Sequence, residues 1–197
     1  MGMVATEQER MAAGYSQWVA RIRVPAGFLF AAVYLLAAEP RPRSMIVGCA
    51  VALVGLALRA ASAGVLEKNR RLAVAGPYAH TRNPLYLGSA IAALGFSIAA
   101  GVGWLFLLLA IFFVAVYVPV MRSEATRLQE LFPAEYAAYA QAVPLLVPRL
   151  TPWKPRDNDA ASFTWQRYWG NHEYRAAAAF ALITAVLAAK LWWMGGD

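Results

Sequence analysis

The chain is a succession of long apolar runs separated by short polar segments. The apolar runs cover residues 24–38, 46–66, 85–100, 104–120 and 176–194. A transmembrane helix needs about 20 mostly apolar residues, so each run is a candidate span, and the short first and third runs require tilt or an extension into the interface. The pattern predicts an all-α, polytopic integral membrane protein with about five transmembrane helices.

The uncharged stretch of residues 83–121 must cross the membrane twice. As one straight helix it would be about 60 Å long, about twice the thickness of the hydrocarbon layer. Gly101 and Gly103 allow a tight turn between two spans. The prolines within 39–44 separate the first two runs in the same way. The first four runs therefore pair as two helical hairpins, and the fifth run follows them.

The chain leaves the membrane after the fourth run. Pro119 is expected to bend or end the helix, and 122–131 then continues as an amphipathic helix. Pro133 fits the first turn of another short helix. The prolines of 144–155 exclude a long helix there, so this segment is an ordered crossing or a lid, and 154–161 is an exposed connector.

The composition agrees with a membrane protein. Hydrophobic residues make up 60% of the 197 residues, and only 15% are charged. The net charge of +7 requires no nucleic-acid partner, because Lys and Arg that flank membrane spans account for it. Cys49 is the only cysteine, which excludes an internal disulfide and a cysteine-based metal cluster. His80 and His172 are far apart in the sequence and lack clustered ligands, so we expect no metal site.

The Lys and Arg residues outside the runs divide unevenly between the two sides of the membrane. With five spans, the N-terminal segment, 67–82 and 122–175 share one side and hold 3, 4 and 7 of these residues, 14 in all, whereas the other side holds 3. Positively charged loops stay in the cytoplasm, so we place the first side there. In a bacterium the membrane would be the inner membrane.

Small residues recur along one face of the third run. Gly88, Ala92, Gly95 and Ala99 are spaced by three and four residues, so a neighbouring helix can approach closely on this face. We interpret the stripe as packing, with a ligand channel along it as the alternative.

Polar and special-backbone residues gather just before the third run, in residues 76–88. Gly76-Pro77 allows a tight turn, and Pro84 restricts Asn83 to extended geometry. Irregular backbone at membrane depth is tolerated only where it is buried in protein or lines a cavity, so one interpretation is a cavity. The alternative is a loop that caps the third span, with Tyr86 at the interface.

A second block returns to the same side of the membrane after the fourth run. Its residues are Glu124, Leu128, Phe132, Tyr136, Tyr139 and Val143-Pro144. Tyr136 and Tyr139 are three residues apart and share a helix face, which serves either packing or catalysis. The two blocks together favour a cavity.

Together the two blocks resemble the isoprenylcysteine carboxyl methyltransferase family and its relatives among the phospholipid methyltransferases, over about residues 64–148. The first part of the family pattern stands here as Gly76-Pro77-Tyr78, Arg82-Asn83-Pro84, Tyr86 and Gly88. The second block departs from the pattern twice, because Ala125 replaces a glutamate and Pro133 replaces a glycine. Asn83 stands where the isoprenylcysteine enzymes usually have His, so the fold and the cofactor carry over better than the prenylated substrate.

The resemblance implies an integral-membrane enzyme that uses S-adenosylmethionine, releases S-adenosylhomocysteine and has no Rossmann domain. The cytosolic helical segment after the fourth span would help to form the cofactor pocket. By similarity, the catalytic residues are Arg82 and Glu124. The cofactor-binding residues are Gly76, Tyr78, His80, Arg82, Asn83, Pro84, Tyr86, Leu87, Gly88, Glu124, Tyr136 and Tyr139. The methyl acceptor would be hydrophobic or lipid-like, such as an isoprenylcysteine carboxylate or a phospholipid amine, or a small thiol or amine.

Charge matching suggests roles for two of these residues. The methyl donor carries a carboxylate, an ammonium and a sulfonium, and buried charges need partners. Arg82 is the candidate for the carboxylate, and Glu124 for the ammonium or the sulfonium side. An amine or thiol acceptor needs a base, for which Glu124, His80 and Tyr139 are candidates, whereas a carboxylate acceptor needs none.

Two further basic residues are open candidates. Arg59 lies inside the second run, so it either faces the bundle interior as part of a site or extends to the interface. Arg149 either binds an acceptor headgroup or is attracted to anionic lipid.

The sequence predicts one membrane domain over 1–197, with its core in 64–148, a connector over 149–175 and a C-terminal span over 176–194. The expected partners are the lipid bilayer and a hydrophobic acceptor. Two rival functions remain, a membrane NADPH-dependent reductase of steroid-reductase-like architecture and a non-catalytic scaffold or sensor module. Binding of S-adenosylhomocysteine without binding of NADPH separates the methyltransferase from both.

Overall fold

The computed structural model describes residues 25, 27–68, 70–154 and 162–195. Every regular element in these ranges is a helix. The elements are the helix Gly27–Ala37, α2 (Pro42–Val65), η1 (Gly76–Ala79), α3 (Pro84–Ala100), α4 (Trp104–Phe112), η2 (Phe113–Tyr117), α5 (Val118–Leu131), α6 (Pro133–Ala142), α7 (Trp165–Gly170) and α8 (Tyr174–Met194).

Three of these helical stretches are long and apolar enough to cross a membrane. They are Pro42–Val65, Trp104–Leu131 and Tyr174–Met194, and the two shorter apolar helices are Gly27–Ala37 and Pro84–Ala100. All five apolar runs of the sequence are therefore helical over most of their length. The predicted all-α, polytopic membrane architecture is confirmed.

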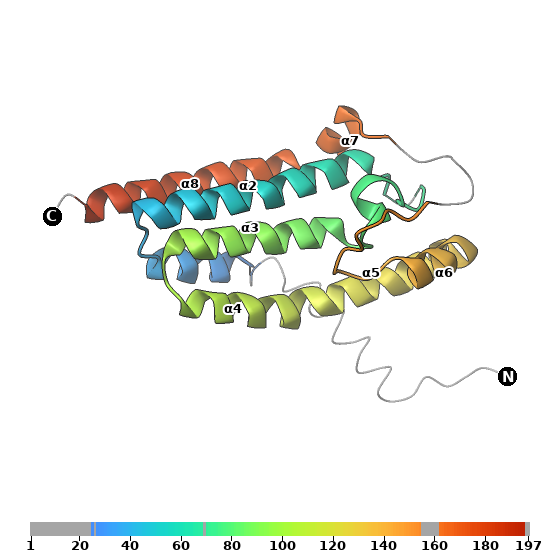
Figure 1. Ribbon diagram of the computed structural model, residues 1–197, viewed down its shortest axis with the longest axis horizontal. Coiled ribbons are helices and arrows are strands. Elements are labelled where there is room, and N and C mark those ends of the chain that lie inside the picture. The colour runs from blue at the N-terminus through green and yellow to red at the C-terminus, as the bar shows by residue number, and fades with distance from the viewer. Residues whose placement is uncertain (1–24, 26, 69, 155–161, 196–197) are drawn as a thin grey trace.

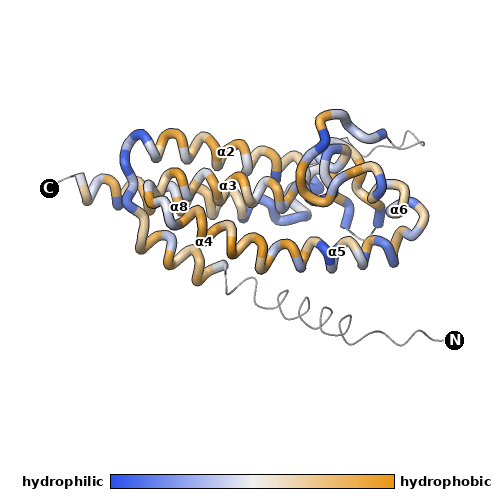
Figure 2. The backbone as a smooth tube through the Cα atoms, turned by 60° about the horizontal axis from the view of Figure 1, so that its bottom comes forward, coloured by the Kyte–Doolittle hydropathy of each residue, from blue (hydrophilic) through white to orange (hydrophobic). Residues whose placement is uncertain are grey.

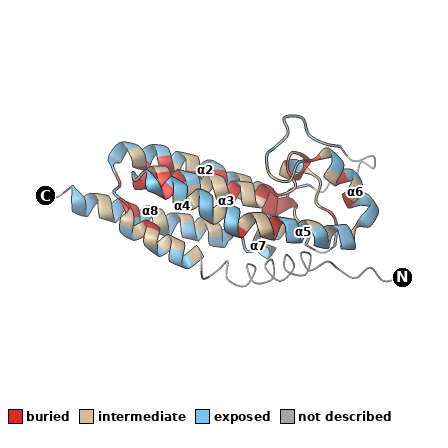
Figure 3. Cartoon of the chain, turned by 90° about the horizontal axis from the view of Figure 1, so that it is seen from below, coloured by how far each residue is buried: buried red, intermediate tan, exposed pale blue. Residues whose placement is uncertain are grey.

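The helices form an elongated bundle with two unlike ends. Helices α8, α2, α3 and α4 run side by side along its length (Figure 1). Apolar residues dominate these helices, whereas hydrophilic segments gather toward the end that carries α6 (Figure 2). Buried residues lie between the helices and again near that polar end (Figure 3). The polar end is therefore the part of the molecule that offers polar side chains to a ligand.

Small residues let α2 and α3 pack closely along their length. The predicted stripe on α3 faces a second set on α2, formed by Gly48, Ala52 and Gly55. A Cβ atom on Gly55 would lie 2.4 Å from the backbone nitrogen of Ala92, and one on Gly95 would lie 2.3 Å from that of Ala52. The stripe therefore serves packing, because the partner helix occupies the space that a ligand channel would need.

The turn between α3 and α4 is the tight hinge that its glycines predict. Gly101 has a left-handed φ of 72°, which glycine adopts without strain. A Cβ atom at this position would lie 2.6 Å from the carbonyl oxygen of Glu39. The N–H of Glu39 donates to the carbonyl of Ala100 at 2.7 Å, so the two hairpins meet at this end of the bundle.

Lys190 joins α8 to the first helix at the same end. Its ammonium group donates to the carbonyl oxygens of Leu35 and Leu36, at 3.0 and 2.8 Å. These carbonyls belong to the last turn of the helix Gly27–Ala37, where no intrahelical partner is available. Lys190 thus holds α8 in place at the end of the bundle that lies away from α6.

Pro119 does not end the fourth span. The helix continues from α4 through η2 into α5, and η2 is a π-helical segment directly before the proline. In a regular α-helix the proline ring clashes with the carbonyl four residues earlier. The wider turn of the π-helix accommodates the ring inside a continuous helix. Of the two expectations for Pro119, a bend or an end of the helix, the structure excludes the end, and the helical continuation to Leu131 is confirmed.

Candidate functional site

The segment 76–88 begins with a tight turn at the polar end of the bundle. Gly76 has a left-handed φ of 56° and opens η1, with Pro77 in the first turn. Asn83 then leads into α3, which begins at Pro84. Both prolines stand at helix starts, where their missing N–H groups cost nothing.

The proline-containing segment 144–153 crosses directly against this turn. The backbone N–H of Arg82 donates to Pro144, and those of Arg149 and Trp153 donate to His80 and Ala79, each at 2.9 Å. These bonds satisfy the backbone polar groups of an otherwise irregular segment. Of the two interpretations, an ordered crossing is therefore the one observed.

Side chains of the turn fix the same crossing. Asn83 Nδ2 donates to the Leu145 carbonyl at 2.9 Å, and Thr81 Oγ1 donates to the Leu146 carbonyl at 3.0 Å. Both side chains are buried. Asn83 therefore stands directly before α3 and binds the crossing segment through its amide nitrogen.

Helix α6 packs its two tyrosines against the turn. Tyr136 and Tyr139 are buried, and their rings meet at 6.2 Å in an edge arrangement. The Tyr139 hydroxyl donates to the backbone carbonyl of Tyr78 at 2.7 Å. Burial raises the pKa of the Tyr139 phenol, and burial, followed by the nearby groups, raises the pKa of the Tyr78 phenol. Both phenols are therefore neutral at physiological pH, which removes Tyr139 as a base.

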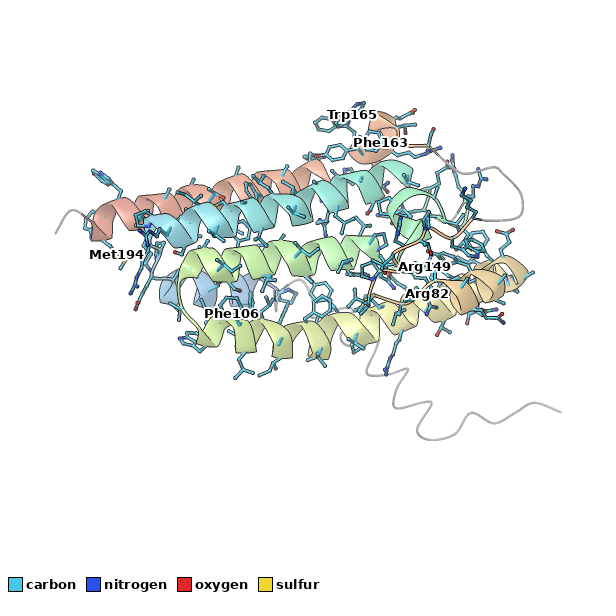
Figure 4. All side chains as sticks on the ribbon, in the orientation of Figure 1. Arg82, Phe106, Arg149, Phe163, Trp165 and Met194 are labelled. Atoms are coloured by element: carbon cyan, nitrogen blue, oxygen red, sulfur yellow. The ribbon has the colours of Figure 1, made fainter. Side chains whose placement is uncertain are left out.

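A cavity of about 520 Å³ opens between the end of α2, the start of α3, α5 and the turn before α8. Its polar lining residues are Arg59, Glu67, Lys68, Arg71, Tyr78, Arg82, Asn83, Tyr86, Glu124, Arg127, Tyr139, Asn171 and Glu173. The volume lies within the range of about 300 to 1,000 Å³ that is usual for small-molecule sites. Figure 4 labels Arg82 at this end of the bundle, between the start of α3 and α6.

Arg82 presents a buried donor without a partner. Its Nη1 donates to the Tyr136 hydroxyl at 3.1 Å, and its guanidinium lies 5.8 Å from the centre of the Tyr136 ring. Its Nε is buried and has no hydrogen-bond partner among the described residues. An unpaired buried donor on a charged group is costly unless a ligand completes it. Arg82 is therefore suited to bind an anionic group in the cavity.

Glu124 lies on the more exposed wall of the cavity, where it joins the two sequence blocks. The Tyr86 hydroxyl donates to Oε1 of Glu124 at 2.8 Å. The Tyr86 ring meets the Tyr117 ring edge-on at 5.4 Å, which fixes the position of Tyr86 on α3. The carboxylate of Glu124 is therefore held at the cavity wall.

Arg59 faces the bundle interior. Its guanidinium forms a bidentate ion pair with Glu173, with distances of 2.6 and 2.9 Å, and Glu173 is only 5% exposed. Its Nη1 also donates to Ser89 Oγ. Arg59 is therefore part of the cavity wall, which agrees with the first of its two sequence interpretations.

The predicted site residues divide into two groups. Those that line the cavity are Tyr78, Arg82, Asn83, Pro84, Tyr86, Glu124 and Tyr139. Gly76, His80, Leu87, Gly88 and Tyr136 are absent from its lining. Tyr136 does not line the cavity itself but accepts a hydrogen bond from Arg82, which does.

Two residues outside the lining have other local roles. The Nδ1 of His80 lies 2.8 Å from the carbonyl oxygen of Arg149, so it contributes to the crossing. Gly88 makes room for Arg59, because a Cβ atom there would lie 2.7 Å from Arg59 Cγ. Arg149 itself donates to the Ala142 carbonyl at 2.9 Å, which ties the crossing to the end of α6.

Sequence reasoning missed the polar cavity residues that belong to neither block. They are Glu67, Lys68, Arg71, Arg127, Asn171 and Glu173. Arg59 is the sequence feature that could have indicated one of them, because a charged residue inside a span needs a partner at the same depth. Glu173, one residue before α8, was the acidic residue in position to supply it.

A separate apolar groove lies between α3 and the helix formed by α4 and η2. Its volume is about 410 Å³. It is lined by Ala90, Ile91, Leu94, Phe106, Leu109, Ala110, Phe113 and Val114. Leu94 and Val114 are exposed, so the groove is open at the surface of the apolar bundle.

Comparison with known proteins agrees with the two sequence blocks. The family model of the phospholipid methyltransferases matches residues 43–135, from α2 to the start of α6. The cobalt-zinc-cadmium resistance protein CzcN of Cupriavidus metallidurans is 35% identical over 85 residues, which are 43% of this chain and 39% of that protein. The chain thus spans less than half the length of this curated relative. No solved structure matches the chain.

Proposed function

We propose that this relative of the phospholipid methyltransferases is an S-adenosylmethionine-dependent methyltransferase that acts on a hydrophobic or lipid-like acceptor. The family resemblance indicates methyl transfer at a membrane. The observation that carries the choice of donor is the buried Arg82 Nε, which lacks a hydrogen-bond partner within the described residues and belongs to a side chain that lines the same cavity as Glu124.

The charges of the cavity match those of the donor. S-adenosylmethionine carries a carboxylate, an ammonium and a sulfonium group. Arg82 offers a guanidinium edge for the carboxylate, and Glu124 offers a carboxylate oxygen for the ammonium or the sulfonium side. Tyr78 and Asn83 also line this cavity. The residues present therefore fit this cofactor.

The donor, when bound, supplies a methyl group on a sulfonium to a nucleophilic acceptor atom. The residues of the chain accelerate such a displacement by holding both reactants in line and away from water. Tyr78 and Tyr139 remain protonated and donate or orient without taking a proton. Glu67 and Glu173 also line the cavity but are held in ion pairs with Arg167 and Arg59, so Glu124 is the candidate to accept a proton from an amine or thiol acceptor. A carboxylate acceptor needs no base.

The apolar groove between α3 and α4 supports a hydrophobic acceptor. Ala90 follows Tyr86 by one helical turn on α3, so the groove leads along α3 toward the Tyr86–Glu124 contact. An acyl or prenyl tail in the groove would place its polar end near Glu124. A tail of this kind would enter sideways from the bilayer.

We place the cavity on the cytoplasmic side and treat the chain as one membrane domain. The excess of Lys and Arg on the side of 67–82 and 122–175 supports this orientation. The donor would then enter from the cytoplasm, where it is made.

The test is transfer of a labelled methyl group. Purified chain, methyl-labelled S-adenosylmethionine and host membrane extract are incubated, and the labelled product is identified against lipid, thiol and prenyl-cysteine standards. We expect one labelled hydrophobic product, strong loss of labelling with Arg82→Ala or Glu124→Gln, and normal labelling with Lys190→Gln. No labelled species in any fraction would contradict the proposal, and oxidation of NADPH in the same extract would support the reductase instead.

A further inference from the structure

The turn Asn171–Glu173, which joins α7 to α8, lies against the cavity. Asn171 and Glu173 both belong to the cavity wall. The turn stands outside residues 43–135, which the family model matches, and outside the two sequence blocks. The family resemblance therefore assigns no role to this turn.

Asn171 fastens the turn to the end of α2. Its Nδ2 donates to the carbonyl oxygens of Ala63 and Leu66, at 2.8 and 3.0 Å. These carbonyls lie in the last turn of the helix, where they lack intrahelical partners. Thr164 N–H donates to the Gly64 carbonyl at 2.9 Å, so the start of α7 is bound to the same helix end.

Glu173 is fastened by Arg59, and Arg59 is fastened by α3. The ion pair of Arg59 and Glu173 is bidentate, and the remaining guanidinium nitrogen donates to Ser89 Oγ. The stem of Arg59 passes over Gly88, where any larger residue would collide with it. The glycine of the first sequence block thus gives Arg59 the space to reach the C-terminal segment.

His172 gives the turn its shape. It has a φ of 57°, the left-handed conformation that costs residues other than glycine about 1–2 kcal/mol. His172 is exposed, whereas Glu173 is buried. Backbone strain of this kind persists only where surrounding contacts fix it, and it is common at ligand sites.

We propose that the turn Asn171–Glu173 is a wall of the ligand site, and that Arg59 and His172 are the residues that position it. The C-terminal helix would then be part of the methyl-donor site and more than a membrane anchor. The inference rests on the proposed function for the identity of the ligand. The geometry of the wall is tested separately from that identity.

The first test needs no ligand. Amide hydrogen exchange is measured on the full chain in lipid nanodiscs, at the N–H groups of Asn171, His172 and Glu173, which donate to Arg167, Trp169 and Tyr168. We expect Arg59→Met and His172→Val to speed exchange at the turn about tenfold. His172→Gly should leave it within about twofold of wild type, because glycine adopts the left-handed conformation freely.

The second test is titration with S-adenosylhomocysteine. Arg59→Met, Glu173→Gln and His172→Val should each weaken its binding about tenfold. The double variant Arg59→Met/Glu173→Met should bind no more weakly than either single variant, because the pair acts as a unit. It also stays folded, since apolar replacement of both partners of a buried pair is often neutral or stabilising.

Lys190→Gln and His172→Gly are the matched controls. Lys190→Gln loosens α8 at the opposite end, so it should lower thermal stability and leave both exchange at the turn and ligand affinity unchanged. Wild-type exchange in Arg59→Met and His172→Val would overturn the proposal, whatever the ligand does. Faster exchange with unaltered affinity would also overturn it, because the turn would then be no part of the site. If the wild-type chain itself fails to bind S-adenosylhomocysteine, the proposed function fails, and the exchange data still decide whether Arg59 and His172 position the turn.

Discussion

The hydroxyl group of Tyr86 donates a hydrogen bond of 2.8 Å to the carboxylate of Glu124. Tyr86 stands in the first turn of α3, and Glu124 stands in α5, beyond the whole membrane hairpin. The bond joins the two sequence blocks at one wall of a cavity. It therefore brings residues that lie 38 positions apart in the chain to the same cavity wall.

We expect Tyr86→Phe to reduce methyl transfer about tenfold, because hydrogen bonds to charged groups contribute about 1.5–3 kcal/mol and Glu124 is exposed enough to lose part of that. The phenyl ring keeps its contact with Tyr117, so the free energy of unfolding should change by less than about 1 kcal/mol. Initial rates and thermal unfolding check both values. Tyr174→Phe, which changes a ring outside the cavity, is the control. Equal methyl-transfer rates for the two variants would show that the Tyr86–Glu124 hydrogen bond does not contribute to the reaction.

Arg82→Lys should weaken S-adenosylhomocysteine binding about tenfold although the charge is kept. Lysine lacks the planar fork of arginine, in which Nη1 donates to Tyr136 and the buried Nε is a second donor with no partner among the described residues. Titration calorimetry measures the change. Arg175→Lys is a matched change outside the cavity and should bind as wild type does. Normal affinity in Arg82→Lys would mean that charge alone is needed, and normal affinity in Arg82→Ala would remove Arg82 from the site.

Gly55→Ala should destabilise the bundle by more than about 2 kcal/mol. The added methyl group would lie 2.4 Å from the Ala92 nitrogen and 2.5 Å from the Gly88 carbonyl oxygen, and both are backbone atoms that cannot move aside. Gly103→Ala is the control, because no atom lies within 4 Å of its added Cβ. Unfolding in a detergent titration compares the two variants. Equal stability would contradict the close packing of α2 on α3.

Stability should fall as the pH rises above about 10, the ordinary pKa of tyrosine. Burial raises the folded-state pKa of Tyr78 and Tyr139, so the folded chain keeps these protons at a pH where the unfolded chain loses them. The stability from both phenols is complete below pH 10 and is lost above it. Tyr139→Phe should lessen this slope and leave part of it to Tyr78, as unfolding measured between pH 8 and 12 shows. An unchanged slope would contradict burial of the Tyr139 hydroxyl.

The sequence predicted the features that depend on local rules. Apolar runs predicted the membrane helices, Gly101 predicted the hinge, and Pro133 predicted the start of α6. Each of these follows from the length of an apolar run or from the backbone preference of one residue. The sequence also predicts the small-residue stripe on α3, whereas the matching stripe on α2 is seen only in the structure.

Local rules do not predict features that depend on contacts between residues far apart in the sequence. The continuous helix through Pro119 needs a π-helical segment, which no residue type announces. Glu173 lies at the cavity and pairs with Arg59 across 114 positions of sequence, a contact that no local pattern predicts. The motif resemblance predicts His80 and Gly88 as site residues, whereas the structure leaves both outside the cavity lining, where His80 contacts the crossing segment and Gly88 makes room for Arg59.

The central claim is that the cavity beside Arg82 and Glu124 binds a sulfonium methyl donor. Direct titration of the full chain in lipid nanodiscs with S-adenosylhomocysteine, and separately with NADPH, tests it most closely. We predict saturable one-site binding of S-adenosylhomocysteine that Arg82→Ala abolishes and Lys190→Gln preserves, and no binding of NADPH. Binding of NADPH alone, or binding of S-adenosylhomocysteine that survives Arg82→Ala and Glu124→Gln together, would contradict the claim.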